Sequence, residues 1–235
     1  ADFPDLLIEA CSSGGLRVDL GLAKHVHCFF MSDPDYTEHH LQVLWGATHM
    51  LPPLAILHWP WSWWRNDYGP SQLNWMNVDI ETFDVMMRAA MVHRIGVSYP
   101  LPKLPERLRE RLSYHLQIFK DHIAPVLPTA TLLSLTDSPF RGNRGERNSA
   151  WQLTSNLNSV NEVHLVISLK LENSAQSAKF RPTQLEANQR YVVVDLETHN
   201  SSTVLGKELT GELLSEIAGN KNSWIVEIRP EKARL

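Results

Sequence analysis

Two stretches near the start of the sequence contain residue types that could bind a ligand or move a proton. Residues 11–17 read Cys-Ser-Ser-Gly-Gly-Leu-Arg, and residues 32–35 read Ser-Asp-Pro-Asp. A glycine such as Gly14 lets the backbone approach a ligand closely, although it is also typical of a plain tight turn. Arg17 could hold a carboxylate through two hydrogen bonds, or it could be a solvated charge at a helix entry.

The two aspartates of the second stretch also have two interpretations. An aspartate before a proline, as Asp33 is before Pro34, is most often a turn residue or a helix N-cap. At the end of a barrel strand the carboxyl group of Asp33 or Asp35 could instead act as a general acid. The pattern of residues alone does not separate these interpretations.

Each stretch follows a short apolar run that predicts a strand. Residues 6–8 and 26–31 are typical of buried parallel strands that deliver polar side chains at their carboxyl ends. The connection between them has the length of a loop plus a short helix. Open α/β sheets and α/β barrels place their chemistry at the carboxyl ends of strands. The polar residues of both stretches therefore fall where a functional site is expected.

Tryptophans are concentrated in one part of the chain. Six of the eight lie between residues 45 and 75, most of them in a proline-interrupted loop after a predicted strand at residues 54–58. These rings could pack the rim of a barrel, or they could stack on the apolar face of a sugar. We expect at least one ring to face a ligand, with Trp59 and Trp61 as the candidates.

The rest of the chain changes character near residue 129. Before it, apolar spacing predicts helices at residues 37–45, 80–92 and 105–124 and a short strand at 95–98. After it, short β-rich segments predict the antiparallel strands of a second domain at residues 151–153, 163–169, 190–196, 203–205 and 224–228. We therefore predict domains at residues 1–128 and 129–235. The spacing of His93, His115 and His122 is too irregular for a metal site, so we predict surface or satisfied core residues.

Composition excludes several functions. The net charge of −4 provides no electrostatic argument for a nucleic-acid or anionic-membrane partner, and no run of 18 apolar residues predicts a membrane span. No Walker or dinucleotide motif is present, so we expect no cofactor and no metal. Cys11 and Cys28 are too few for a disulfide framework, which favours a cytoplasmic location, although the sequon at Asn200 leaves secretion open.

These motifs resemble those of the melibiase-type α-galactosidases of glycoside hydrolase family 36. Residues 3–19 resemble a family block in which an acidic residue precedes Cys-x-x-Gly and an Arg and an Asp follow, and residues 32–33 resemble its Ser-Asp motif. Residues 45–58 and 84–104 are similar to later barrel blocks. Residues 209–214 resemble a strand of the family's C-terminal β-domain. The resemblance extends over nearly the whole chain.

The resemblance implies the C-terminal half of a (β/α)8 barrel, starting near strand five, followed by an antiparallel β-sandwich domain. It implies retaining hydrolysis of terminal α-galactosides by two aspartates. Asp33 would be the acid/base, Cys11 and Gly14 would line the pocket at the sugar 2-hydroxyl, and Arg17 would lie beside the nucleophile. The implied partner is an α-galactoside oligosaccharide or glycoconjugate, and a homo-oligomer of the longer protein stays open.

The sequence departs from the family in one important respect. The family's nucleophile lies in a Lys-Trp-Asp motif, which occurs nowhere in these 235 residues. We therefore expect the chain to be part of a longer enzyme, a hydrolase that uses double displacement, and to be inactive alone. The alternatives are a transglycosidase of the raffinose-synthase type, an α-N-acetylgalactosaminidase and a non-catalytic galactoside-binding protein.

Overall fold

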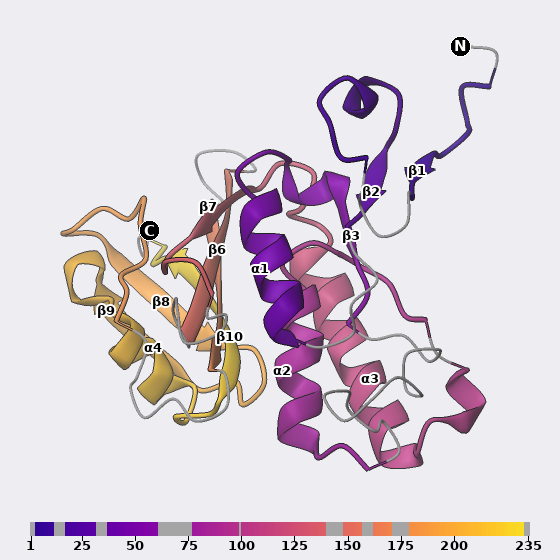
Figure 1. Cartoon of the computed structure of the whole chain (residues 1–235). Coiled ribbons are helices and arrows are strands. Elements are labelled where there is room, and N and C mark those ends of the chain that lie inside the picture. Colours follow the sequence, from indigo (N-terminus) through magenta and orange to yellow (C-terminus); the bar gives the residue numbers. More distant parts are fainter. Residues whose placement is uncertain are drawn as a thin grey trace.

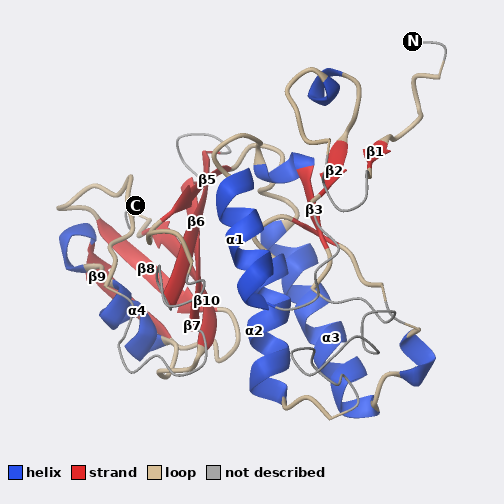
Figure 2. Ribbon diagram, in the orientation of Figure 1, coloured by secondary structure: helices blue, strands red, loops and turns tan. Residues whose placement is uncertain are grey.

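The described part of the chain contains two β-sheets with helices between them. The computed structural model describes residues 3–11, 17–31, 37–60, 77–98, 100–139, 148–156, 162–170 and 179–232. The first sheet is parallel and the second is antiparallel, and helices α1, α2 and α3 lie beside the first sheet (Figure 1). The expected mixture of an α/β part followed by a β-rich part is therefore confirmed (Figure 2).

The parallel sheet contains four very short strands in chain order. They are β1 (Glu9–Ala10), β2 (Cys28–Phe30), β3 (Ile56–His58) and β4 (Arg94–Ile95). Each strand pairs in parallel with the next one along the chain, so that the order is β1-β2-β3-β4. Because all four strands run in the same direction, their carboxyl ends meet at one edge of the sheet.

The position predicted for the first strand is wrong. The apolar run at residues 6–8 was expected to be buried, yet Leu7 is 77% exposed and Leu6 is 54% exposed. Pairing begins only at Glu9, which lies opposite Cys28. Among the described strands, β1 is paired along one edge only, so the residues before it have no sheet neighbour to cover them.

The three predicted helices of the first part are confirmed with small shifts of their ends. They are α1 (Thr37–Ala47), α2 (Ile80–Ala90) and α3 (Glu106–Ile118), and the last continues through a π-helical turn at Phe119–Ile123. The side chain of Asp79 caps α2 by accepting a hydrogen bond from the Thr82 N–H at 2.8 Å. No helix within the described residues is long and apolar enough to cross a membrane.

The antiparallel sheet contains six strands in the order β5-β6-β7-β10-β8-β9. Their bounds are β5 (Thr131–Ser134), β6 (Asn148–Asn156), β7 (Glu162–Lys170), β8 (Arg190–Asp195), β9 (Ser201–Leu205) and β10 (Ser223–Pro230). Strand β5 was not predicted, and the other five coincide with the predicted segments. All the described antiparallel strands belong to this one sheet, so the second layer of a sandwich stays a prediction.

The segment that resembled a strand of the family β-domain forms a helix instead. Helix α4 (Gly211–Ile217) begins where the Thr210 side chain accepts a hydrogen bond from the Leu213 N–H. This N-cap satisfies one of the free donors at the start of the helix, and Leu214 is fully buried on the inner face. The cap and the buried leucine therefore both fit a helix at this segment.

One hydrophobic core joins the two parts of the chain. Its buried members include Phe29 of β2 and Leu41 of α1, and also Trp151 and Ile167 from the antiparallel sheet. Helix α2 is in contact with β7 and β10 of that sheet as well as with α1 and α3. Helix α2 therefore packs against the antiparallel sheet as well as against the other two helices, and the shared core links that sheet to the parallel one.

Candidate functional site

The carboxyl edge of the parallel sheet is the candidate site. The chain leaves β1 at Cys11, β2 at Met31, β3 at Trp59 and β4 at Gly96. Backbone pairing continues just beyond the strands, because the Met31 N–H donates to the Leu57 carbonyl and the Gly96 N–H donates to the His58 carbonyl, at 2.8 Å for the latter. The sheet therefore fixes the backbone up to the point where the loops begin.

The predicted site residues are only partly covered by the described structure. Cys11 is exposed, with a free thiol, directly after β1, and Arg17 is exposed in the turn that follows. Gly14, Asp33 and Trp61 lie outside the described residues. The strand that precedes Asp33 in the chain, β2, is the direct neighbour of β1, with Ala10 opposite Phe29.

Trp59 is one aromatic residue that the structure places at this edge. Its ring packs on Phe30, with 4.4 Å between ring centroids and 46° between ring planes. Phe30 is only 2% exposed, whereas Trp59 keeps part of its surface accessible. Trp59 therefore combines a buried support with a partly accessible side chain, as an aromatic binding surface requires.

Two histidines lie buried next to the same strands. His58 is 4% exposed and His93 is fully buried, and burial lowers the pKa of His58 to about 3. Burial, with the nearby His58, also lowers the pKa of His93 well below its ordinary value. Within the described residues neither ring nitrogen of His93 has a hydrogen-bond partner. The prediction that His93 is a surface or satisfied core residue is therefore wrong.

These histidines predict a loss of stability in mild acid. Because both are neutral in the folded chain, only the unfolded chain gains their protons as the pH falls below about 6.5. We expect the free energy of unfolding to fall from pH 6.5 downward, and His93→Leu to reduce the slope by about 1.4 kcal/mol per pH unit. Urea unfolding at pH 7, 6 and 5 measures that slope.

The matched control for this prediction is His25→Leu, which removes an exposed histidine. We expect this variant to keep the slope of the parent chain. If His93→Leu also kept that slope, His93 would not be a neutral histidine in the folded chain.

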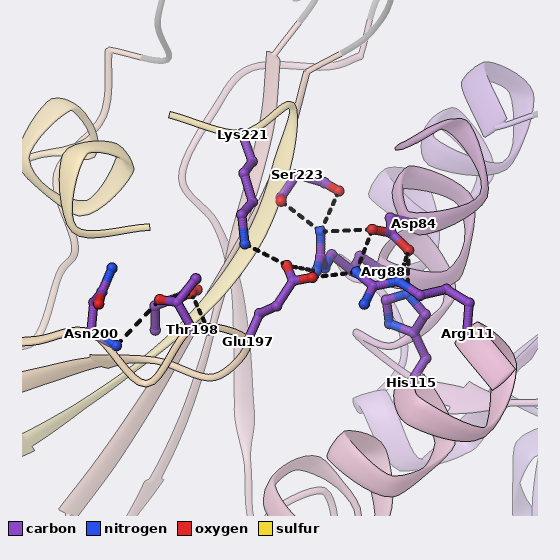
Figure 3. Close-up of polar contacts among 10 residues, drawn as sticks. Asp84, Arg88, Arg111, His115, Glu197, Thr198, Asn200, Lys221 and Ser223 are labelled. Atoms are coloured by element: carbon purple, nitrogen blue, oxygen red, sulfur yellow. Dashed lines mark hydrogen bonds and ion pairs between the residues drawn. The ribbon is translucent and has the colours of Figure 1, made fainter. Parts of the chain in front are cut away.

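A second cluster of charged residues lies between the helices and the antiparallel sheet. Figure 3 shows Arg88 of α2 extending toward the loop ends of the sheet, where it donates to the Ser223 carbonyl at 2.6 Å and to Glu197 at 2.8 Å. Arg111 of α3 donates to both Asp84 and Glu197. Lys221 donates to Glu197 at 2.7 Å, and His115 bonds to Asp84 at 2.8 Å.

Both carboxylates of this network are held in the ionised form. Burial acts to raise the pKa of Asp84, but hydrogen bonds from His115 and Arg111 outweigh it and lower the pKa to about 2. Burial likewise acts against ionisation of Glu197, and Lys221 with Arg88 overcomes it, so that its pKa is also about 2. A general acid needs a pKa closer to the working pH. We therefore interpret this network as structural.

The network was not predicted, because its partners are far apart in the sequence. Arg88 and Ser223 are separated by 135 residues, and Arg111 and Glu197 by 86. The Asp84 and Arg88 pair at i and i+4 on one helix face is the only local sign of it. Among the described residues no group of three or more His, Cys, Asp or Glu side chains could hold a metal ion.

Comparison with known proteins identifies the first part of the chain. The profile of the Melibiase family matches residues 1–127. A search of curated proteins found no match. The match covers more than half of the 235 residues, and it includes the whole parallel sheet and helices α1 to α3.

Solved structures match almost the whole chain. The galactosidase domain of the α-galactosidase-sucrose kinase AgaSK is 16% identical, with a TM-score of 0.70 over 98% of this chain and 30% of its own. The α-galactosidase from Lactobacillus brevis is 15% identical, with a TM-score of 0.68 over 100% of this chain and 30% of its own. The α-galactosidase AgaA from Geobacillus stearothermophilus is 18% identical, with a TM-score of 0.64 over 98% of this chain and 29% of its own. The chain thus spans about 30% of the length of these structures and shares their fold.

Proposed function

The chain belongs to the Melibiase family, and on that premise we propose that it is the acid/base-carrying part of a retaining α-galactosidase. The substrates would be terminal α-galactosides. The observation that carries this proposal is the direct parallel pairing of β1 with β2. That pairing makes the Cys11 end of one strand the neighbour of the strand that leads to Asp33.

We propose that the parallel sheet is half of a (β/α)8 barrel in the complete enzyme. The strand order β1-β2-β3-β4 follows the chain without reversal, as successive βα units of a barrel do. A doubly wound sheet would contain a switch point in that order. The exposed apolar residues before β1, such as Leu7, would be covered by the neighbouring strands. Residues 1–128 would then belong to the barrel and residues 129–235 to the β-domain.

Within this barrel, the resemblance to the family assigns the roles of the site residues. Asp33, beyond β2, would protonate the departing glycosidic oxygen and later deprotonate the attacking water. Cys11 and Gly14, beyond β1, would line the pocket at the sugar 2-hydroxyl. Arg17 would lie beside the nucleophile and favour its ionised form. The nucleophile itself would come from a part of the enzyme outside this sequence.

Known complexes support α-galactoside oligosaccharides as the substrate class. Variants of AgaA from Geobacillus stearothermophilus have been solved in complex with raffinose and with stachyose. Their folds resemble this chain with TM-scores of 0.63 and 0.64. We extend that substrate class to the complete enzyme here, where Trp59 places a partly accessible indole ring at the carboxyl edge.

Activity measurements on two forms of the protein test this proposal. We expect the protein extended at its N-terminus, with a Lys-Trp-Asp strand about one βα unit earlier, to hydrolyse a chromogenic α-galactoside. We expect the 235-residue chain alone to show no turnover, because a single carboxylate cannot carry out double displacement. If the 235-residue chain alone turned over the substrate, and if Asp33→Asn abolished that turnover, the chain would contain a complete catalytic pair. An extended protein that binds galactosides without turnover would favour the non-catalytic alternative.

A further inference from the structure

Trp59 is fixed in place from the strands on both sides of its own. It follows β3, yet its ring contacts Phe30 of β2, and it also lies over Gly96 at the end of β4. The parallel register makes this possible, because Phe30 pairs opposite Leu57 and His58 pairs opposite Ile95. The ring therefore spans the ends of three neighbouring strands.

The space at Gly96 explains why a glycine is needed here. A methyl group at this position would lie 2.5 Å from Cδ1 and 2.6 Å from Nε1 of Trp59, far inside ordinary contact distance. Gly96 does not have a positive φ, so its backbone conformation is open to any residue. Its N–H donates to the His58 carbonyl at 2.8 Å, which holds the backbone in place. Steric space for the indole ring, and not backbone freedom, is therefore what the glycine provides.

The contact with Phe30 constrains the ring as well. Phe30 is 2% exposed and cannot move away without disturbing the core, because protein interiors are closely packed. Trp59 itself has only two side-chain torsions, so contacts with Phe30 and Gly96 leave its ring little freedom to rotate. An aromatic surface that is already fixed loses little conformational freedom when a ligand binds.

We propose that Gly96 is a positioning residue that seats Trp59 against Phe30, so that the indole forms a fixed wall for the apolar face of a hexopyranose. The proposal rests on the proposed function, since it assigns Trp59 to the sugar site of that enzyme. Gly96 itself acts only through Trp59. A side chain at position 96 displaces the ring and weakens sugar binding more than the chemical steps.

The first test observes the ring itself and does not depend on activity. The indole N–H signal of Trp59 in the 235-residue chain is identified by its loss in Trp59→Phe. We expect Gly96→Ala to shift this signal and leave the other tryptophan signals in place. Gly46→Ala is the matched control, because a methyl group at Gly46 would meet nothing within 4 Å. An unshifted Trp59 signal in Gly96→Ala would overturn the proposal.

The second test measures sugar recognition in the extended enzyme. We expect Gly96→Ala to raise KM for raffinose roughly three- to tenfold with kcat nearly unchanged, as the loss of one aromatic contact would. In a Trp59→Ala background, Gly96→Ala should add no further change. An unchanged KM would show that Trp59 does not contact the sugar. The same conclusion would follow if Gly96→Ala raised KM equally with Trp59 present and in Trp59→Ala. If the extended enzyme hydrolysed no galactoside, the proposed function would be wrong. The placement of Trp59 by Gly96 would still be tested, because the indole signal reports on it independently of activity.

Discussion

Asp33→Ala in the extended enzyme is expected to slow hydrolysis of raffinose by about 10²- to 10⁴-fold, the usual contribution of a general acid. The reason lies in the leaving group. A sugar alkoxide is a poor leaving group, so its oxygen must gain a proton as the glycosidic bond breaks. We therefore expect the activated substrate p-nitrophenyl α-galactoside, whose phenolate leaves without help, to be slowed far less in that bond-breaking step.

The neighbouring carboxylate provides the control for this prediction. Asp35 lies two residues away in the same sequence motif, so Asp35→Ala removes the same charge from the same stretch. We expect Asp35→Ala to keep the ratio of the raffinose rate to the p-nitrophenyl α-galactoside rate that the unmodified enzyme shows. Single-turnover measurements of galactosylation with both substrates give the ratio directly. If Asp33→Ala slowed both substrates equally, Asp33 would not be the acid.

The sequence predicted the local elements better than their environment. Helices α2 and α3 were predicted because their apolar spacing is long enough to define a helical period. Strands β2 and β3 were predicted from short apolar runs that end at polar residues or prolines. Strand β1 was misplaced, because the apolar run of residues 6–8 looks like a buried strand whatever its neighbours are. Residues 209–214 resemble a strand of the family β-domain, yet helix α4 begins there, with Thr210 as its N-cap.

The candidate site residues were predicted from sequence motifs. The residues that pack against them were not predicted. Cys11 was singled out by the resemblance and Trp59 by its residue type, and the structure places each directly after a strand. Gly96 looks like any small residue at the end of a short strand, and its contact with Trp59 depends on the register of two strands. The burial of His93 without a hydrogen-bond partner likewise depends on packing between distant segments. Contacts of this kind leave no period or motif in a sequence.

Arg88→Met is expected to lower the free energy of unfolding by about 3–5 kcal/mol, the usual cost of removing one partner from a buried ion pair. Arg88 is 2% exposed, and it supplies hydrogen bonds to Glu197 and to the carbonyl of Ser223. Methionine fills much of the same volume but donates nothing. Urea unfolding at pH 7 measures the loss, and Arg190→Met is the control, because the exposed pair of Arg190 with Glu231 should contribute less than about 1 kcal/mol.

The direction of the acid response separates the network from simple packing. The pKa values of Asp84 and Glu197 are both lowered to about 2 in the folded chain, so their contribution to stability is complete above about pH 4.5 and is lost as the pH falls toward 2. Without Arg88 both folded pKa values rise toward their ordinary range. Arg88→Met should therefore show a weaker dependence of stability on pH between 4.5 and 2 as well as a lower stability at pH 7. A variant that lost stability at pH 7 and kept the full acid dependence would indicate that Arg88 acts through packing alone. The network joins α2 and α3 to the antiparallel sheet, which also shares an apolar core with them. The pH dependence of Arg88→Met therefore also tests whether these ion pairs help to hold the two parts of the chain together.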